Sequence, residues 1–295
     1  MRLFKKILKN WLYVDTRTLA LFRIVFGVVG LIDVLRRYGL IDVFYSDAGM
    51  NFRRQFTSKY SIKYFSLLDH LHTTVEVHFF FIFTSICFFF LILGYHTRIF
   101  QFLSAIGLIS IHNAAIILEN GGDMVFNNFL IWTLFLPLGA SWSVDSMRKS
   151  LKKQPEYDSN DLNQPINVDS TQIFHFAYLA CLVQLSLIYF YTTINKTGAM
   201  WSDGTAVFYM YQLETFLTPV GEWIAQHIGI GLSSLMTLST LPAQTYASFA
   251  ILCPVFQPWL RRFALVIFIG FHGVLAISVN IGLFSWVMLA VLIFL

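Results

Sequence analysis

The segment 172–191 reads QIFHFAYLACLVQLSLIYFY and contains no Asp, Glu, Lys or Arg. An uninterrupted run of about 20 apolar residues is long enough for a helix to cross the hydrocarbon core of a bilayer. Because apolar and polar residues do not alternate along the run, it predicts a helix and not a strand of a membrane barrel. The segment therefore places the chain among proteins built from membrane-spanning helices.

The composition of the whole chain supports the same class. Of the 295 residues 57% are hydrophobic and 12% are charged, whereas soluble domains carry about 25% charged residues. We expect an all-α, polytopic transmembrane bundle that forms one domain over residues 1–295, with short interfacial or re-entrant helices between the spans. About eight spans are expected, at 18–35, 77–93, 99–118, 124–138, 172–191, 232–255, 263–279 and from 281 onward.

Three polar segments flank the expected spans. Residues 1–15 are basic and carry Trp11 and Tyr13, which suits a segment that lies on an anionic membrane surface. Residues 36–75 are expected to form a loop with short interfacial helices, and the polar residues 143–171 a cytosolic loop. The distribution of Lys and Arg favours a cytoplasmic N-terminus. Because residue 295 still lies in apolar sequence, we expect the chain either to continue or to end within the membrane.

A single basic residue follows the apolar run at 172–191. It lies in the segment Tyr191-Thr-Thr-Ile-Asn-Lys-Thr-Gly-Ala-Met-Trp-Ser-Asp-Gly204, and this residue, Lys196, is the only Lys or Arg between Lys153 and Arg261. One interpretation is an anchor whose ammonium group reaches the lipid headgroups. The other is a desolvated amine that acts as a base. The residues alone leave both interpretations open.

Besides Lys196, six ionisable residues fall at or near the expected membrane depth. They are Arg23, His112, Glu119, Asp123, Glu214 and His272, and such residues are functional candidates because burying them in a membrane is costly. We expect Arg23 to face the bundle interior; the alternative to a functional role is pairing between helices, for example of Arg23 with Glu119 or Asp123. The cysteines and histidines show no spacing typical of a metal site, so no metal is expected, and the basic residues flank spans, so no nucleic acid is expected as a partner.

Five sequence motifs occur in an order that resembles a known family. The motifs are LALFRIVFG at 19–27, LGYHTRI at 93–99, WSVD at 142–145, Lys196 followed by Trp201 and Gly204, and Phe271-His272 with IGLFSWVMLA at 281–290. Together they resemble the vitamin K-dependent gamma-glutamyl carboxylase superfamily, also called HTTM (horizontally transferred transmembrane) domain proteins. The similarity extends over residues 15–290.

The resemblance implies a membrane enzyme. Enzymes of this family oxidise reduced vitamin K, here a menaquinol-like quinol, with O2, and the strong base so formed removes a proton from a peptide glutamate, which then adds CO2. Lys196 matches the lysine that deprotonates the quinol, and Arg23, His112, Asp123, Trp201 and His272 are candidates for lining its site. A lysine acts as a base only in its neutral form, so the protein must lower the pKa of this lysine from about 10.4 to about 7–8.

Two departures from the family pattern keep a second hypothesis open. The catalytic histidine of the family aligns with Gly122, next to Asp123, and the family's soluble C-terminal part is absent from residues 1–295. The alternative is a non-catalytic protein of the same fold that binds lipid or quinone and aids peptide maturation or export. Under either hypothesis we expect a multi-pass protein of a bacterial inner membrane, with the bilayer, a quinone and a peptide or protein as partners; the oligomeric state is not indicated.

Overall fold

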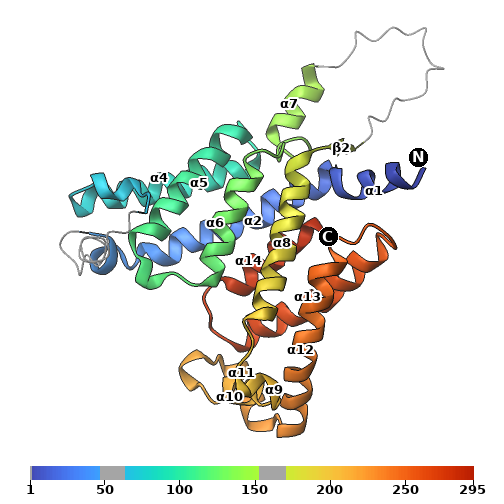
Figure 1. The fold of residues 1–295 in the computed structure, drawn as a ribbon. Coiled ribbons are helices and arrows are strands. Elements are labelled where there is room, and N and C mark those ends of the chain that lie inside the picture. Colours follow the sequence, from blue (N-terminus) through green and yellow to red (C-terminus); the bar gives the residue numbers. More distant parts are fainter. Residues whose placement is uncertain (1, 47–63, 153–170) are drawn as a thin grey trace. The chain divides into compact units, whose positions relative to one another are not determined.

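The computed structural model describes residues 2–46, 64–152 and 171–295, and they are mostly α-helical (Figure 1). Within these ranges the only sheet is the antiparallel pair of β1 (Tyr13–Asp15) and β2 (Gln172–Phe174). The predicted all-α class is confirmed. The chain divides into two compact units, the first made of Met1–Leu12, Asn120–Val125 and Phe176–Leu295, the second of Tyr13–Glu119 and Phe126–His175.

The second unit is organised around two long helices that pack against each other, α2 (Thr16–Tyr38) and α4 (Thr74–Leu93). A Cβ atom at Gly30 of α2 would collide with the ring of Phe88 in α4, so the missing side chain permits their close approach. The other elements are η1 (Ile41–Tyr45), η2 (Leu67–His70), α5 (Thr97–Ala114), η3 (Ile116–Leu118), α6 (Gly121–Thr133), whose first turn belongs to the first unit, and α7 (Val144–Lys152).

The first unit is organised around α8 (Phe176–Ile194) and α12 (Ile230–Ala250), which pack along each other. Its other elements are α1 (Arg2–Leu12), α9 (Ala199–Ser202), α10 (Ala206–Met210), η4 (Glu214–Phe216), α11 (Pro219–His227), α13 (Trp259–Ser278), α14 (Phe284–Val291) and η5 (Leu292–Phe294). Helix α12 continues through Pro242 without interruption.

In the described part of the chain, four helices are long and apolar enough to cross a membrane: α2, α4, α8 and α13. They correspond to four of the eight expected spans, and each carries large apolar side chains on its outer surface, among them Phe79 of α4 and Val266 of α13. The other four expected spans correspond to α5, α6, α12 and α14, which do not meet the same limits of length and hydropathy among the described residues. Their crossing of the membrane stays a prediction.

The structure also refines three of the expected segments. Residues 172–174 belong to strand β2, so the helix of the segment 172–191 begins at Phe176 and ends at Ile194. Helix α7 occupies the start of the expected loop 143–171, whose residues 153–170 lie outside the described ranges. Residues 47–63 of the expected loop 36–75 also lie outside them. The basic residues at the N-terminus form helix α1, followed by β1.

Candidate functional site

Lys196 is held by three neighbours just beyond the end of α8. Its Nζ atom donates one hydrogen bond to the backbone oxygen of Thr192 at 2.9 Å and another to Oε1 of Gln244 at 3.0 Å. The Trp201 ring centroid lies 5.2 Å from Nζ, within the range of a cation–π contact. Gln244 is buried on α12, and Lys196 is half-buried. The structure therefore brings together two of the predicted site residues, Lys196 and Trp201.

The spacing from Lys196 to Gly204 follows from two tight turns. The backbone N–H of Lys196 donates to the oxygen of Thr193, which continues the last turn of α8, and α9 then begins at Ala199. This short helix carries Trp201 back over Lys196. Gly204 follows with a φ of 79°, a left-handed conformation that favours glycine. A side chain at position 204 would strain this turn, which explains why a glycine follows the tryptophan.

The surroundings of Lys196 act on its protonation in opposite directions. Burial lowers the pKa of Lys196 because the ammonium form loses contact with water. Its named neighbours, by contrast, are two carbonyl oxygens and an aromatic face, which all interact well with an ammonium group. Among the described residues no carboxylate pairs with Lys196. The amine is thus easier to deprotonate than an exposed lysine, and it is fixed in place.

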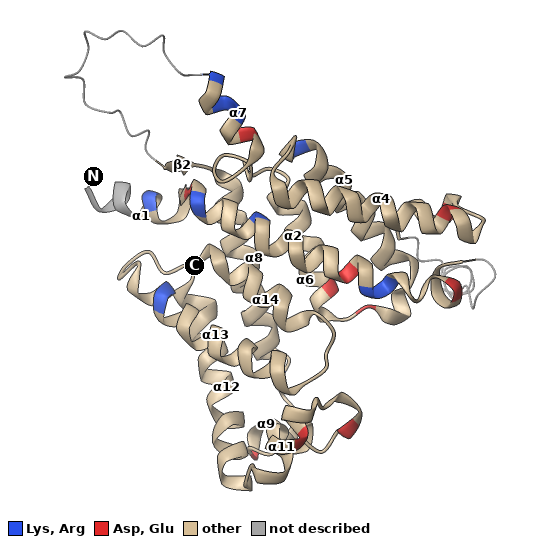
Figure 2. Cartoon of the chain, turned by 180° about the vertical axis from the view of Figure 1, so that it is seen from behind, with Lys and Arg blue, Asp and Glu red and all other residues tan. Residues whose placement is uncertain are grey.

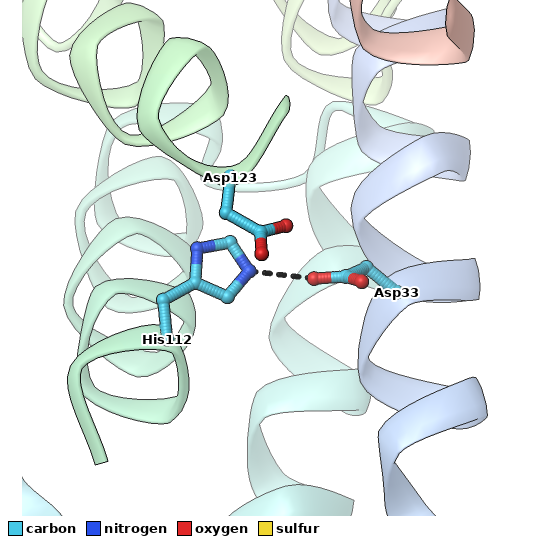
Figure 3. A group of neighbouring side chains, drawn as sticks. All are labelled: Asp33, His112 and Asp123. Carbon is cyan, nitrogen blue, oxygen red and sulfur yellow. Dashed lines mark hydrogen bonds and ion pairs between the residues drawn. The ribbon is translucent and has the colours of Figure 1, made fainter. Parts of the chain in front are cut away.

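A buried ion-pair network lies in the second unit, where α2 meets α5. His112 of α5 places Nε2 at 2.6 Å from Oδ2 of Asp33 in α2 and Nδ1 at 2.8 Å from Oδ1 of Asn127 in α6. Arg36 and Arg37, which follow Asp33 at helical spacing, bind the same carboxylate through their Nε atoms at 2.7 and 3.1 Å. Figure 3 shows the His112 ring pointing at the Asp33 carboxylate. The Asp33 carboxylate thus links α2 to α5, and His112 extends the network to α6.

The partners of His112 were not among the predicted site residues. One sequence signal was present, because Arg36 and Arg37 follow Asp33 by three and four residues and so share a helix face with it. Carboxylate and imidazole are both metal-ligand types. However, at 2.6 Å the two facing atoms of Asp33 and His112 are joined directly by a hydrogen bond, which leaves no space for an ion between them.

Asp123 lies in the first turn of α6 and is buried. Its Oδ2 atom accepts a hydrogen bond from the backbone N–H of Asn120 at 3.1 Å, which ties the start of the helix to the preceding turn. Asn127 follows four residues later and therefore lies on the same face of the helix. One clear role of Asp123 is to fix the start of this helix.

Arg23 binds backbone carbonyls instead of the expected carboxylates. Its guanidinium donates to the oxygens of Leu138 at 2.9 Å, Ser141 at 3.3 Å and Trp142 at 2.6 Å, and its side chain is almost fully buried. The expected pairing with Glu119 or Asp123 is therefore replaced by contacts to the segment that leads into α7. Since these acceptors are backbone atoms, the contacts position chain segments.

The motifs at 93–99 and 142–145 meet at the same place. Asp145 accepts hydrogen bonds from the backbone N–H of His96 at 2.9 Å and of Thr97 at 2.7 Å, so it caps the start of α5. A Cβ atom at Gly94, which has a φ of 68°, would collide with Ser143 and with Arg23. The motifs at 19–27, 93–99 and 142–145 are thus in direct contact within the second unit.

A family model for the HTTM domain matches residues 12–295. The chain belongs to the HTTM domain family. The predicted family is confirmed over nearly the whole chain, and the apolar helices of this HTTM protein agree with an integral membrane protein. The comparisons with curated proteins and with solved structures returned no match.

Gly122 of this HTTM protein has no space for a side chain. A Cβ atom at this position would lie 2.6 Å from the Cα atom and 3.0 Å from the backbone nitrogen of Phe284, at the start of α14. Real Cβ contacts of 2.6 Å essentially never occur, and the obstacle is backbone. A histidine at the aligned position therefore requires α14 to move, so its absence is built into the packing of the first unit.

His272 lies among aromatic side chains, apart from the immediate contacts of Lys196. Its Nε2 atom is 3.2 Å from the hydroxyl oxygen of Tyr189 in α8, and the rings of Phe268 and Phe284 lie around it. The imidazole is buried, and its Nδ1 atom has no hydrogen-bond partner. Tyr189 precedes Lys196 by about two helical turns. The structure therefore places Lys196 and His272 against the same helix but at different levels.

Proposed function

We propose that this HTTM protein is a membrane enzyme in which Lys196 accepts a proton from the hydroxyl group of a reduced quinone. The observation that carries the proposal is the half-buried Lys196 side chain, which Gln244 and Trp201 hold in place and which pairs with no carboxylate of the described residues. Burial lowers the pKa of this lysine, which favours the neutral amine that a base requires. A lysine that only anchors a span needs no such fixed contacts.

A cavity in the same unit suits an apolar substrate. It measures about 690 Å³ and opens between α8, α12 and the segment 252–260, with an almost entirely apolar lining. Sites for small ligands commonly measure about 300–1,000 Å³. Phe190 on its wall lies six residues before Lys196, an axial distance of about 9 Å along α8. Tyr246 lies two residues after Gln244, about 3 Å along α12. A lipid-soluble quinol in this cavity reaches Lys196 by a short displacement along the helices.

The proposed step is a proton transfer. The quinol O–H bond breaks, its proton passes to the Nζ lone pair, and the resulting quinolate stays beside the new ammonium group. Thr192 and Gln244 then stabilise that ammonium through the hydrogen bonds they already accept. Oxidation by O2 and addition of CO2 to a glutamate are implied by the family resemblance, and the proposal assigns no residue to them.

Turnover of a naphthoquinol by the purified protein in lipid nanodiscs tests the proposal. We expect O2-dependent product formation in the wild type and a loss of at least about 100-fold in Lys196→Met, because proton transfer by a positioned base contributes about 10²–10⁴-fold. Arg262→Gln, which removes an exposed cation beside Trp259, serves as the matched control and keeps the wild-type rate. Equal rates in the wild type and Lys196→Met contradict the proposal.

The contact of Gly122 with Phe284 favours a second candidate, a non-catalytic protein that binds lipid or quinone and aids peptide maturation or export. Under this alternative the family histidine is lost and Lys196 is a structural cation that joins α8 to α12. Quinone binding without any turnover supports this candidate and rules out the first. Thermal unfolding of Lys196→Met is a further measurement. A purely structural cation affects only stability, so the second candidate predicts a lower unfolding temperature for this variant and no effect on any catalytic rate.

A further inference from the structure

A second cavity, of about 500 Å³, lies in the second unit, where the turn after α4, the segment 137–140 and helix α7 meet. Four cationic side chains line it: Arg98, Arg148, Lys149 and Lys152. Figure 2 shows the Lys and Arg residues along α7 and at the start of α5. None of these residues belongs to the site around Lys196, so this cavity is independent of the proposed function.

The positive charge of this cavity is only partly balanced. The single carboxylate in the lining is Asp145, and its two oxygens accept hydrogen bonds from the backbone N–H groups of His96 and Thr97 and from the Thr97 hydroxyl. Burial tends to raise the pKa of Asp145, but these hydrogen bonds outweigh it and leave the pKa below its usual value. Among the described residues no carboxylate pairs with any of the four cations.

The same hydrogen bonds decide which groups remain available to a ligand. The backbone N–H groups at the start of α5, which have no partner within the helix, already donate to Asp145. The backbone therefore contributes little to anion binding here. The guanidinium of Arg148 lies over the ring of Tyr95, 4.6 Å from its centroid, which positions it at the cavity. Binding must therefore come from the Lys and Arg side chains, which suit phosphate oxygens.

The location of the cavity identifies the source of the phosphate. Helix α4 is long and apolar enough to span the membrane and ends at Leu93, so the turn that follows lies where the hydrocarbon core gives way to headgroups. Ile99 lines the cavity and is 57% exposed, and Trp142 nearby is 58% exposed. Cationic groups beside exposed apolar groups match a molecule that joins a phosphate to acyl chains.

We propose that this cavity binds the headgroup phosphate of an anionic phospholipid, with Arg98, Arg148, Lys149 and Lys152 around the phosphate and Ile99 against an acyl chain. Helix α7 then lies at the headgroup layer, with its cations toward the lipid. A bound lipid links α7 to the start of α5, two segments that Asp145 already joins.

The test measures lipid binding to the purified full chain by native mass spectrometry, with phosphatidylglycerol, phosphatidylcholine and inorganic phosphate as separate probes. We expect phosphatidylglycerol to bind more tightly than phosphatidylcholine, and inorganic phosphate at equal concentration not to displace it. Each cation near a membrane surface contributes about fivefold in affinity. The double variant Arg148→Gln, Lys149→Gln is therefore expected to lose about 25-fold, and Arg98→Gln alone about fivefold.

The matched control is Arg262→Gln, which removes an exposed cation outside this cavity and leaves phosphatidylglycerol binding unchanged. Unfolding temperatures verify that each variant is folded, and Arg98→Gln keeps the test valid if the double variant is not. Equal binding of the two lipids, or unchanged binding in both variants, overturns the proposal. Displacement by inorganic phosphate at equal concentration also overturns it, because the site then recognises free phosphate and not a lipid.

Discussion

The ammonium group of Lys196 donates a hydrogen bond of 3.0 Å to the side-chain oxygen of Gln244, which joins the end of α8 to α12. The two residues are 48 positions apart in the chain. Gln244 is the only side chain that accepts a hydrogen bond from this Nζ atom among the described residues. The pair therefore offers a way to change the protonation of Lys196 without removing it.

Gln244→Glu is expected to raise the pKa of Lys196. A carboxylate at this position stabilises the ammonium form, and an adjacent opposite charge shifts a pKa by about 1–3 pH units. The pH at which quinol turnover reaches half its maximum moves upward by that amount, and the rate at neutral pH falls. Gln244→Met, which removes the acceptor without adding charge, shifts the profile in the opposite direction. Identical pH profiles in all three proteins contradict the assignment of Lys196 as the base.

Gly122→Ala is expected to destabilise the protein by about 1–3 kcal/mol, the usual cost of overpacking. The reason is the Phe284 backbone, which lies 2.6 Å from the added Cβ atom. Gly121→Ala is the matched control, because there the nearest atoms, in the Phe284 ring, are 3.9 Å away. Unfolding in mild detergent, followed by circular dichroism, measures both. Equal stability of the two variants refutes the close contact at Gly122.

Asp33→Asn is expected to destabilise the protein by about 3–5 kcal/mol, because it leaves the buried guanidinium of Arg37 without its carboxylate. The control is Arg36→Gln, which removes a partly exposed partner of the same carboxylate and costs at most about 1 kcal/mol. Denaturant titration measures the two differences in unfolding free energy. A loss in Asp33→Asn no greater than that in Arg36→Gln shows that the buried pair contributes little.

Asp15 is expected to make the stability depend on pH in the acid range. Hydrogen bonds from the Arg17 side chain, and then from its backbone and from Thr171, lower the pKa of Asp15 to about 2. Because the folded pKa lies below the unfolded value of 3.8, this stabilisation is complete above about pH 5 and is lost progressively as the pH falls through 2 to about 1.

We expect that loss to be about 1 kcal/mol, since Arg17 is mostly exposed and water screens the ion pair. Asp15→Asn keeps a capping side chain at the start of α2 but removes the titration. Its difference from the wild type should therefore shrink below about pH 5 and be mostly lost at pH 2. A constant difference from pH 2 to 7 excludes Asp15 as the titrating group.

Composition and long apolar runs predicted the all-α class and the four long apolar helices, because those features report directly on burial in lipid, whereas α7 lies in a segment that was expected to be a loop. Helix α8 is shifted by three to four residues at each end relative to the expected span 172–191, since residues 172–174 pair with β1 and the turn at Thr192–Thr193 extends the helix. The helices α5 and α12 carry buried polar residues such as Gln101 and Gln244 on their inner faces. Such residues lower the mean hydropathy, so length and hydropathy alone do not identify these helices as spans.

The sites were harder to predict because their partners are distant in sequence. The contact between Lys196 and Trp201 is local and follows from the motif, whereas Gln244 lies on another helix and carries no local signal. Likewise, the ion pair of Asp33 and Arg37 was not among the predicted contacts, and its further partner, His112, lies 79 residues from Asp33 in the chain. For Arg23, the sequence indicated burial correctly but suggested carboxylates, and the acceptors proved to be backbone oxygens, which a sequence does not distinguish.

Chemical rescue of Lys196→Ala tests the central claim most directly. The variant leaves a space beside Gln244 and Trp201, and small primary amines of graded pKa are added during naphthoquinol turnover. If Lys196 is the base, the amines restore turnover, and the rate increases with the basicity of the free amine. An absence of rescue by any amine that fits, in a variant that is folded and still binds the quinol, contradicts the assignment of Lys196 as the base.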